Sequence, residues 1–253
     1  MRAAQWRTVL LVAVVLIALE LACRLGILSP SNIVPPSQMA VALWSELTSG
    51  AILPDLAQTM FCVAASVAIA SVGGIAIGVA LHHLFRVRRA LNPILASYYA
   101  IPIFAFYPGL AAVMGLGDAP IIIVSVLNAI IGMVIASIDG LDRFPRVLSK
   151  VAQLHGLSGW KRFWHLQLRA AAPSLMAGVK LVVAYSFIGV IGSEFLMAPS
   201  GVGYEIAYSY NNFNVPRMYG LMLLVVLIVA GVNALMGIPE RRISAHAQSR
   251  RDS

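Results

Sequence analysis

Six long stretches of apolar residues constrain this chain more than any other feature of its sequence. A helix crosses the hydrocarbon core of a bilayer with about 20 apolar residues, and each stretch is close to that length or longer. Only 11% of the residues are charged, whereas soluble chains average about 25%. We therefore predict an all-α integral membrane protein with about six transmembrane helices, forming a single domain over residues 1–253. The predicted spans cover residues 8–28, 55–81, 90–115, 120–138, 172–197 and 218–238.

The basic residues predict the orientation of these helices, because lysine and arginine gather in cytoplasmic loops. With a cytoplasmic N-terminus, all but three of the 18 basic residues lie on the cytoplasmic side, and the opposite topology would place the same residues outside. We therefore expect both termini in the cytoplasm. The net charge of +8 follows from these dispersed residues and does not indicate nucleic-acid binding. The three exceptions are Arg24, Lys180 and Arg217.

The N-terminal region predicts an uncleaved first span followed by a short helix at the outer surface. A charged segment before an apolar run also suits a signal peptide, but the apolar character resumes after Glu20. Glu20 and Arg24 are four residues apart, a spacing that lets them pair on one helix face. Pro35 and Pro36 then end this segment, and Ser37 is expected to cap the next helix through its hydroxyl.

The third stretch predicts a broken helix. Pro102 and Pro108 each remove a helical hydrogen bond, and irregular backbone at membrane depth is tolerated where it is buried in protein or lines a cavity. Aromatic residues cluster around both prolines. Two interpretations remain: the wall of a solute pathway, or ordinary aromatic packing around kinks. The pathway hypothesis names Tyr98, Tyr99, Pro102, Phe104, Tyr107, Asn128 and Glu194.

Polar residues inside the other spans each allow two interpretations. Asn128 is expected to form a hydrogen bond between helices or to contact solute. Ionisable residues within a membrane are candidates for function, so Glu194 and Lys180 either line the pathway or are structural charges paired between helices. They are fourteen residues apart, roughly 21 Å along a helix, and so are not partners within one helix.

Small residues in the second span predict close packing with another helix. Gly74 and Gly78 form a GxxxG pattern, and Ala70 lies one turn earlier. Small residues at this spacing let two helix backbones approach closely.

No motif for catalysis occurs in the chain. The phosphate-binding GxxxxGK[ST], the zinc-binding HExxH and the nucleophile motif GxSxG are all absent. Cys23 and Cys62 lie within apolar runs, which is typical of small buried residues. We predict that the chain is not an enzyme and holds no metal.

A polar, basic segment at about 143–169 separates the fourth and fifth spans. Apolar residues at helical spacing on both sides of Gly156 predict two short amphipathic helices joined at this glycine. Their apolar face either lies on the bilayer or inserts into a groove on a partner protein. The candidate contact residues are Lys150, Ala152, His155, Gly156, Trp160, Lys161, Phe163 and Trp164.

This segment resembles the EAA loop of ABC importer permeases, whose pattern is E-A-A-x3-G-x9-I-x-L-P. Ala152, Gly156 and Leu168 occupy matching positions, whereas Lys150 and Arg169 replace the glutamate and the proline. Four further segments resemble the nitrate/sulfonate/taurine type of these permeases, in the same order over about residues 30–240. They are IVPPSQMAVALWSEL, ALNPILASYYAIPIFAFYP, GLGDAP and GSEFLMAPSGVGYEI.

The resemblance implies a permease subunit in a type I ABC importer of the bacterial inner membrane. Two permease copies, most simply a homodimer, would form the pathway for a small solute: a sulfonate, taurine or nitrate-like anion, or a small organic compound. Separate ATPase subunits would bind ATP and magnesium and contact the EAA-like loop, and a periplasmic or lipid-anchored binding protein would deliver the solute. The alternative is an ion-coupled secondary transporter that uses Glu194 and Lys180.

Overall fold

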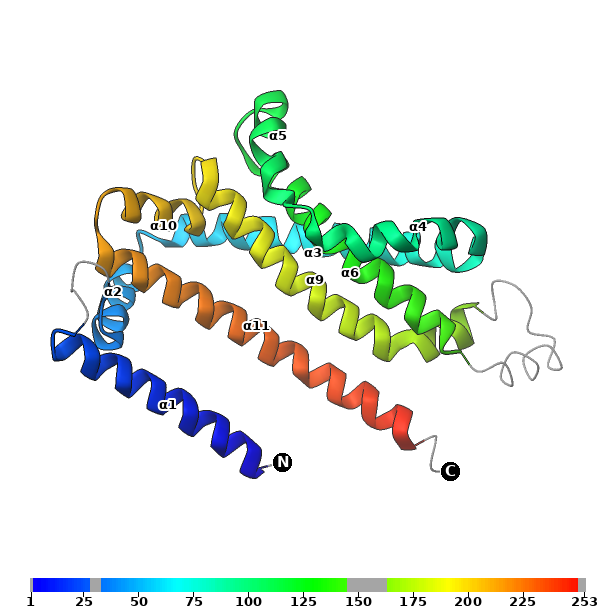
Figure 1. Cartoon of the computed structure of the whole chain (residues 1–253), viewed down its shortest axis with the longest axis horizontal. Helices are drawn as coiled ribbons and strands as arrows, with labels where there is room; N and C mark the ends of the chain where they lie inside the picture. The colour runs from blue at the N-terminus through cyan, green and yellow to red at the C-terminus, as the bar shows by residue number, and fades with distance from the viewer. Residues whose placement is uncertain (1, 28–32, 145–162, 250–253) are drawn as a thin grey trace.

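The computed structural model describes residues 2–27, 33–144 and 163–249. Every regular element in these ranges is a helix, which confirms the all-α prediction (Figure 1). The α-helices are α1 (Arg2–Arg24), α2 (Pro36–Ser49), α3 (Leu53–His83), α4 (Phe85–Ser97), α5 (Tyr107–Met114), α6 (Asp118–Asp142), α9 (Leu168–Met197), α10 (Val202–Asn211) and α11 (Val215–Ser249). The 3-10 helices η1 (Tyr98–Ala100) and η2 (Ile103–Phe106) and the π-helical turn η3 (Phe163–Gln167) complete the described elements.

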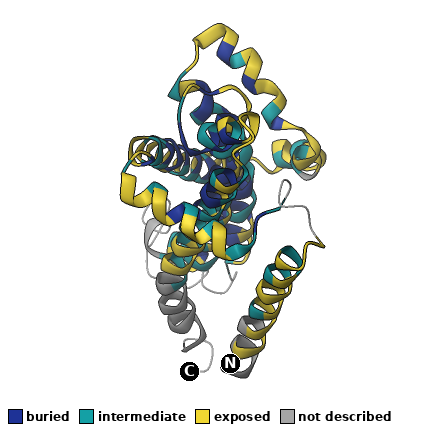
Figure 2. Ribbon diagram, turned by 90° about the vertical axis from the view of Figure 1, so that its left-hand side faces the viewer, coloured by how far each residue is buried: buried dark blue, intermediate teal, exposed yellow. Residues whose placement is uncertain are grey.

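Within the described residues, four helices are long and apolar enough to cross a membrane: α3, α6, α9, and α11 over Val215–Gly237. A fifth is added if the bent pair Phe85–Ala100 and Ile103–Met114 forms one span. The prediction of about six crossings exceeds this number. α1 forms a helix where the first crossing was predicted, and most of its described residues are exposed beside the bundle (Figure 2).

The third predicted span is broken as expected, but at one proline rather than two. The two helical segments meet at 85°, and Pro102 lies at the break with ψ 81°, outside the helical range. Pro108 instead lies in the first turn of α5, where proline is tolerated because its missing N–H would have no helical partner. The predicted break at Pro108 is therefore wrong. After the bend, α5 projects from the bundle (Figure 1).

The core of the protein lies where α3, α6 and α9 pack together. A Cβ atom added at Gly74 would lie 2.5 Å from Cβ of Met133, and one at Gly78 would lie 2.5 Å from Cβ of Ser137. Contacts this short require glycine, so α3 approaches α6 closely at both positions. The predicted role of the GxxxG pattern is confirmed.

Glu20 of α1 accepts two polar contacts, one within its own helix and one from α2. Arg24 donates to Glu20 over 2.7 Å, as the sequence predicts. The hydroxyl of Ser37 does not cap α2, whose cap position is Pro35; it donates to Glu20 over 2.7 Å. The predicted cap is therefore wrong, because α2 begins at Pro36 and Ser37 lies inside its first turn rather than at the cap position.

The elements are distributed between two ends of the molecule. The start of α1, the end of α6 and the far part of α11 lie toward one end, whereas α2 and α10 lie toward the other (Figure 1). At the first of these ends, Asp142 accepts from Arg88 over 2.7 Å and contacts His82 over 3.0 Å. Asp142 thereby ties α4 and the end of α3 to α6.

Candidate functional site

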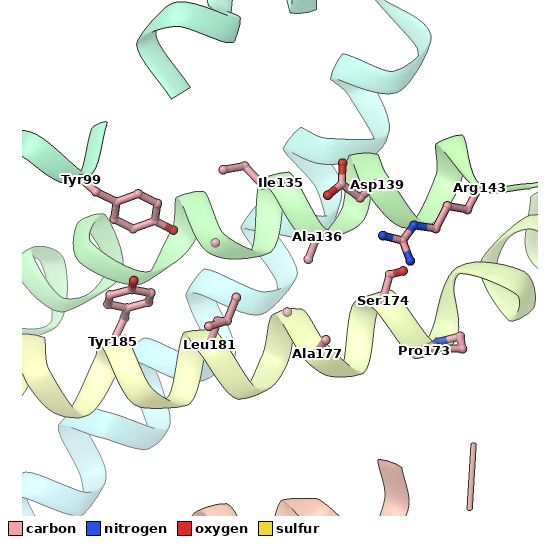
Figure 3. Close-up of a pocket in the computed structure, with 12 residues that line it drawn as sticks. Tyr99, Ile135, Ala136, Asp139, Arg143, Pro173, Ser174, Ala177, Leu181 and Tyr185 are labelled. Carbon is pink, nitrogen blue, oxygen red and sulfur yellow. The ribbon is translucent and has the colours of Figure 1, made fainter. Parts of the chain in front are cut away.

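Two neighbouring cavities lie along the contact between α6 and α9. The larger has a volume of about 550 Å³ and the smaller about 210 Å³. Figure 3 shows the larger cavity, with α6 and α9 forming its long walls. Its lining residues are Tyr99, Gly132, Ile135, Ala136, Asp139, Arg143, Pro173, Ser174, Ala177, Gly178, Leu181 and Tyr185. The smaller cavity is lined by Tyr98, Tyr99, Ile101, Ile103, Asn128 and Tyr185.

Three of the residues proposed for a solute pathway meet at the smaller cavity. They are Tyr98, Tyr99 and Asn128. The hydroxyl of Tyr98 donates to the carbonyl of Leu127 over 2.8 Å, and the Nδ2 amide of Asn128 donates to the carbonyl of Tyr185 over 3.0 Å. Asn128 thus forms the predicted hydrogen bond between helices and also lines a cavity.

The larger cavity changes in polarity along its length. Its middle is lined by small or apolar side chains, among them Gly132, Ala136 and Leu181. Asp139 and Arg143 line the end nearest the last turn of α6 (Figure 3). A solute in this cavity would therefore meet aromatic hydroxyls at one end and two opposite charges at the other.

Phe104 and Tyr107 lie in the packed interior on the other side of the bend. Tyr107 is fully buried in the cluster that includes Cys62, Val124 and Phe187. Phe104 packs against α9, where a Cβ atom at Gly192 would lie 2.7 Å from its ring. Neither residue lines the two cavities, so these positions favour the interpretation as aromatic packing.

Glu194 lies in a closed polar cluster away from both cavities. Its side chain is only 1% exposed. Its carboxylate accepts hydrogen bonds from the hydroxyl of Thr59 over 2.9 and 3.0 Å and from the N–H of Gly203 over 2.9 Å. These contacts join α3, α9 and the start of α10, which favours the interpretation of Glu194 as a structural charge between helices.

The same cluster fixes the connection between α9 and α10. The N–H of Gly201 donates to Asp55 over 2.8 Å, and the N–H of Val202 donates to Thr59 over 2.9 Å. Gly201 has φ +104°, and a Cβ atom there would lie 2.4 Å from Cδ of Glu194. Both the backbone conformation and the space beside the carboxylate therefore require glycine at this position.

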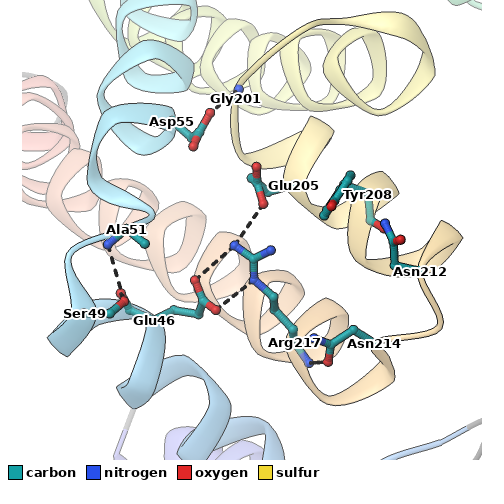
Figure 4. Close-up of polar contacts among 10 residues, drawn as sticks. All are labelled: Glu46, Ser49, Ala51, Asp55, Gly201, Glu205, Tyr208, Asn212, Asn214 and Arg217. Atoms are coloured by element: carbon teal, nitrogen blue, oxygen red, sulfur yellow. Dashed lines mark hydrogen bonds and ion pairs between the residues drawn. The ribbon is translucent and has the colours of Figure 1, made fainter.

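A second polar cluster joins α2, α10 and α11 at the end of the molecule where α2 and α10 lie (Figure 4). Arg217 contacts Glu46 over 2.8 Å and Glu205 over 2.9 Å. The three side chains are between 17% and 25% exposed. One guanidinium thus holds two carboxylates from different helices together.

Comparison with known proteins identifies this arrangement. Residues 70–245 match the family described as "Binding-protein-dependent transport system inner membrane component". The chain belongs to this family. It is therefore a permease subunit of an ABC importer, as the sequence resemblance implied, and its partners are ATPase subunits and a substrate-binding protein.

Curated relatives of the permease cover most of its length. It is 26% identical to the riboflavin transport system permease protein RibX of Chloroflexus aurantiacus, over 84% of this chain and 80% of that protein. It is 25% identical to the nitrate import permease protein NrtB of Leptolyngbya laminosa, over 75% of this chain and 68% of that protein. It is 24% identical to the formylaminopyrimidine transport permease protein ThiX of Halalkalibacterium halodurans, over 80% and 83%.

A solved structure shares the fold of the permease. An inward-facing conformation of the MetNI methionine ABC transporter matches with a TM-score of 0.68 over 78% of this chain and 98% of the matched chain, at 16% identity. The likeness confirms the type I importer fold predicted from the sequence.

Most residues predicted to contact an ATPase lie outside the described part of the permease. These are Lys150, Ala152, His155, Gly156, Trp160 and Lys161. Phe163 and Trp164 belong to η3, which leads directly into α9. The role of the whole set remains a prediction.

Sequence reasoning missed several residues that shape the cavities of the permease. Tyr185, Asp139 and Arg143 line the larger cavity but were absent from the predicted site. Tyr185 is the only tyrosine in the fifth apolar stretch, a signal that singles it out without showing what it faces. Asp139 and Arg143 are four residues apart at the end of α6, which places them on one face.

Proposed function

We propose that this permease supplies half of the pathway of a homodimeric, ATP-driven importer for a small organic solute. The observation that carries this proposal is the pair of cavities between α6 and α9. Tyr99 and Leu181 line the larger cavity and are 46% and 48% exposed, so a single chain leaves its hollow accessible from the surface. A second copy placed against that face would enclose it.

The projecting helix α5 supports assembly with a second copy. Apolar side chains near both ends of this helix are exposed: Val113 of α5 at 86%, and Phe106, the last residue of η2 just before α5, at 54%. Large exposed apolar surfaces mark contacts with lipid or protein. We infer that lipid and a second permease share this surface in the inner membrane.

The distribution of elements supports the proposed orientation. The start of α1 and the far part of α11 lie toward the same end as the last turn of α6 (Figure 1). In the sequence, the end of α6 leads into the 143–169 segment, whose basic residues the positive-inside bias assigns to the cytoplasm. We therefore propose that both termini are cytoplasmic and that this segment contacts the ATPase subunits, which bind ATP and magnesium and carry out hydrolysis.

The cavity linings support an organic solute more than nitrate. None of the six described residues that line the smaller cavity is charged. Aromatic or amide side chains in the two linings are Tyr98, Tyr99, Asn128 and Tyr185. Binding sites for organic compounds combine apolar and aromatic walls with a few polar groups. Among the relatives, the permeases named for riboflavin and formylaminopyrimidine handle compounds of this kind.

A pull-down from the native host in mild detergent tests this function, with the recovered proteins identified by mass spectrometry. We expect an ATPase subunit and a binding protein to be recovered, and Gly156→Pro to abolish recovery of the ATPase by disrupting the predicted helix pair. Size-exclusion chromatography of the variant shows whether the permease itself remains folded. Recovery of the permease alone, with uptake unaffected by ATP depletion, would contradict the importer and favour the secondary transporter.

A further inference from the structure

The two cavities meet at one pair of aromatic rings. Among the described residues, Tyr99 and Tyr185 alone line both the larger and the smaller cavity. Their rings stack with centroids 5.4 Å apart and an angle of 25° between the planes. Figure 3 shows the two side chains facing each other from opposite walls. A solute moving from one cavity to the other would therefore pass this pair.

The two rings are held by backbones of different kinds. Tyr185 lies within the long helix α9, and its carbonyl is held by Asn128 of α6. Tyr99 lies in the 3-10 segment η1, directly before the 85° bend. Short 3-10 segments often mark hinges because their hydrogen-bond geometry is poorer. One ring thus extends from a long helix whose backbone is held, and the other is carried by a segment that can reorient.

A glycine on α6 leaves room for the ring of Tyr99. A Cβ atom at Gly132 would lie 3.3 Å from the Tyr99 hydroxyl, so a larger residue there would press on the ring. The neighbouring Tyr98 is anchored to the carbonyl of Leu127 over 2.8 Å. This anchor fixes the start of η1 and leaves the position of Tyr99 to its own backbone and to its partner ring.

The chemistry of the junction favours a flat aromatic solute. Stacked aromatic rings attract each other beyond simple burial of apolar area, so separating the pair has a free-energy cost. A flat solute inserted between the rings restores one stacking contact on each side, whereas a small anion restores neither. The larger cavity, at about 550 Å³, lies within the range that holds organic ligands.

We propose that Tyr99 and Tyr185 form an aromatic gate between the two cavities, which a flat aromatic solute opens by replacing the contact between the rings. This inference rests on the proposed importer function and adds the residues that select the solute within the pathway. The gate is a property of this chain and is independent of which binding protein delivers the solute.

The barrier can be tested without a known solute. In the complete importer, Ile103, which lines the smaller cavity and is only 6% exposed, is replaced by cysteine in a Cys23→Ser, Cys62→Ala background. A membrane-impermeant thiol reagent is then added to inside-out vesicles without nucleotide. We expect slow labelling with both tyrosines present and labelling about tenfold faster with Tyr99→Ala or Tyr185→Ala, because the stacking is lost. Tyr99→Phe and Tyr185→Phe are the matched controls and should label slowly. Equal labelling rates in all variants would overturn the gate.

The solute class is tested with riboflavin as the flat probe and nitrate as the small anion. Riboflavin fluorescence is titrated with the purified complete importer in nanodiscs. We expect saturable quenching, a Kd raised about tenfold by Tyr185→Ala, a Kd unchanged by Tyr185→Phe, and no competition by nitrate. Absence of quenching, or displacement by nitrate, would overturn the proposed selectivity.

ATP hydrolysis by the same preparation distinguishes a failure of the proposed importer function from a failure of the proposed gate. An importer that lacks a co-purified ATPase would contradict the proposed function, whatever the tyrosine variants do. An importer that hydrolyses ATP but shows no effect of the alanine variants on labelling or quenching would contradict the gate alone.

Discussion

Two groups of charged side chains in this apolar permease lie in opposite surroundings. Glu194 is 1% exposed, and its carboxylate is surrounded by donors from α3 and α10. Asp139 and Arg143 are exposed and line the open cavity between α6 and α9. The comparison shows that depth alone does not assign a role to a charge in the membrane: the enclosed group holds helices together, whereas the open pair is accessible to solute.

The largest effect is expected on removing the enclosed charge. Glu194→Ala leaves the Thr59 hydroxyl and the Gly203 N–H without their acceptor. Since hydrogen bonds to charged groups contribute about 1.5–3 kcal/mol each, we expect a loss of about 3 kcal/mol or more, seen as a lower Tm and less monodisperse permease in detergent. Glu194→Gln should lose less, because the amide oxygen still accepts. Full stability of Glu194→Ala would contradict the conclusion that this enclosed carboxylate holds the helices together.

A smaller loss of stability is expected from crowding the same cluster. A Cβ atom at Gly203 would lie 2.5 Å from the carbonyl oxygen of Ile191 and 2.6 Å from Cβ of Glu194. Backbone cannot yield easily, so Gly203→Ala should cost about 1–3 kcal/mol. Gly231→Ala is the matched control, because no atom lies within 4 Å of a Cβ there. Thermal unfolding of the two variants should differ clearly, and equal Tm values would contradict the close packing.

The partly exposed cluster around Arg217 (Figure 4) should lose an intermediate amount of stability when its cation is removed. Arg217→Ala leaves Glu46 and Glu205 facing each other without their shared cation. Partly exposed ion pairs contribute about 1 kcal/mol or less, so we expect a modest drop in Tm. Salt screens such pairs, and the difference from the wild type should therefore shrink in high salt. A drop that is insensitive to salt would indicate lost packing.

The smallest effect on stability is expected at the open pair. Asp139→Asn removes a charge from an exposed side chain, and such substitutions usually change stability by about 0.5 kcal/mol or less. Because Asp139 lines the larger cavity, we expect ATP-dependent uptake to change while Tm does not. A Tm loss as large as that of Glu194→Ala would show that the two groups are alike after all.

Features within one helix could be predicted from the sequence. The pairing of Glu20 with Arg24 depends only on helical spacing, and the break at Pro102 follows from the chemistry of proline. Close packing at Gly74 and Gly78 also follows, because small residues at this spacing form a smooth face whichever helix covers it.

Features between helices could not be predicted in the same way. The sequence does not show that Tyr185 faces Tyr99, because this depends on how α9 is rotated against the bent segment. The acceptor of the Ser37 hydroxyl was missed for the same reason, since Glu20 lies seventeen residues away on another helix. The sequence therefore placed Tyr99, Tyr107 and Glu194 in one pathway hypothesis. Only the tertiary structure shows that Tyr99 lines the cavities and that Tyr107 and Glu194 are packed elsewhere.

The contrast between α1 and α3 bears on how the chain enters the membrane during synthesis. α1 has mostly exposed apolar side chains among its described residues, so it can settle in lipid on its own hydrophobicity as soon as it emerges. α3 packs Gly74 and Gly78 against α6, which the ribosome completes about sixty residues later. Until then this face must rest against lipid or an insertion factor, so the permease passes through an interval of synthesis in which α3 lacks the helix that its glycines are shaped to meet.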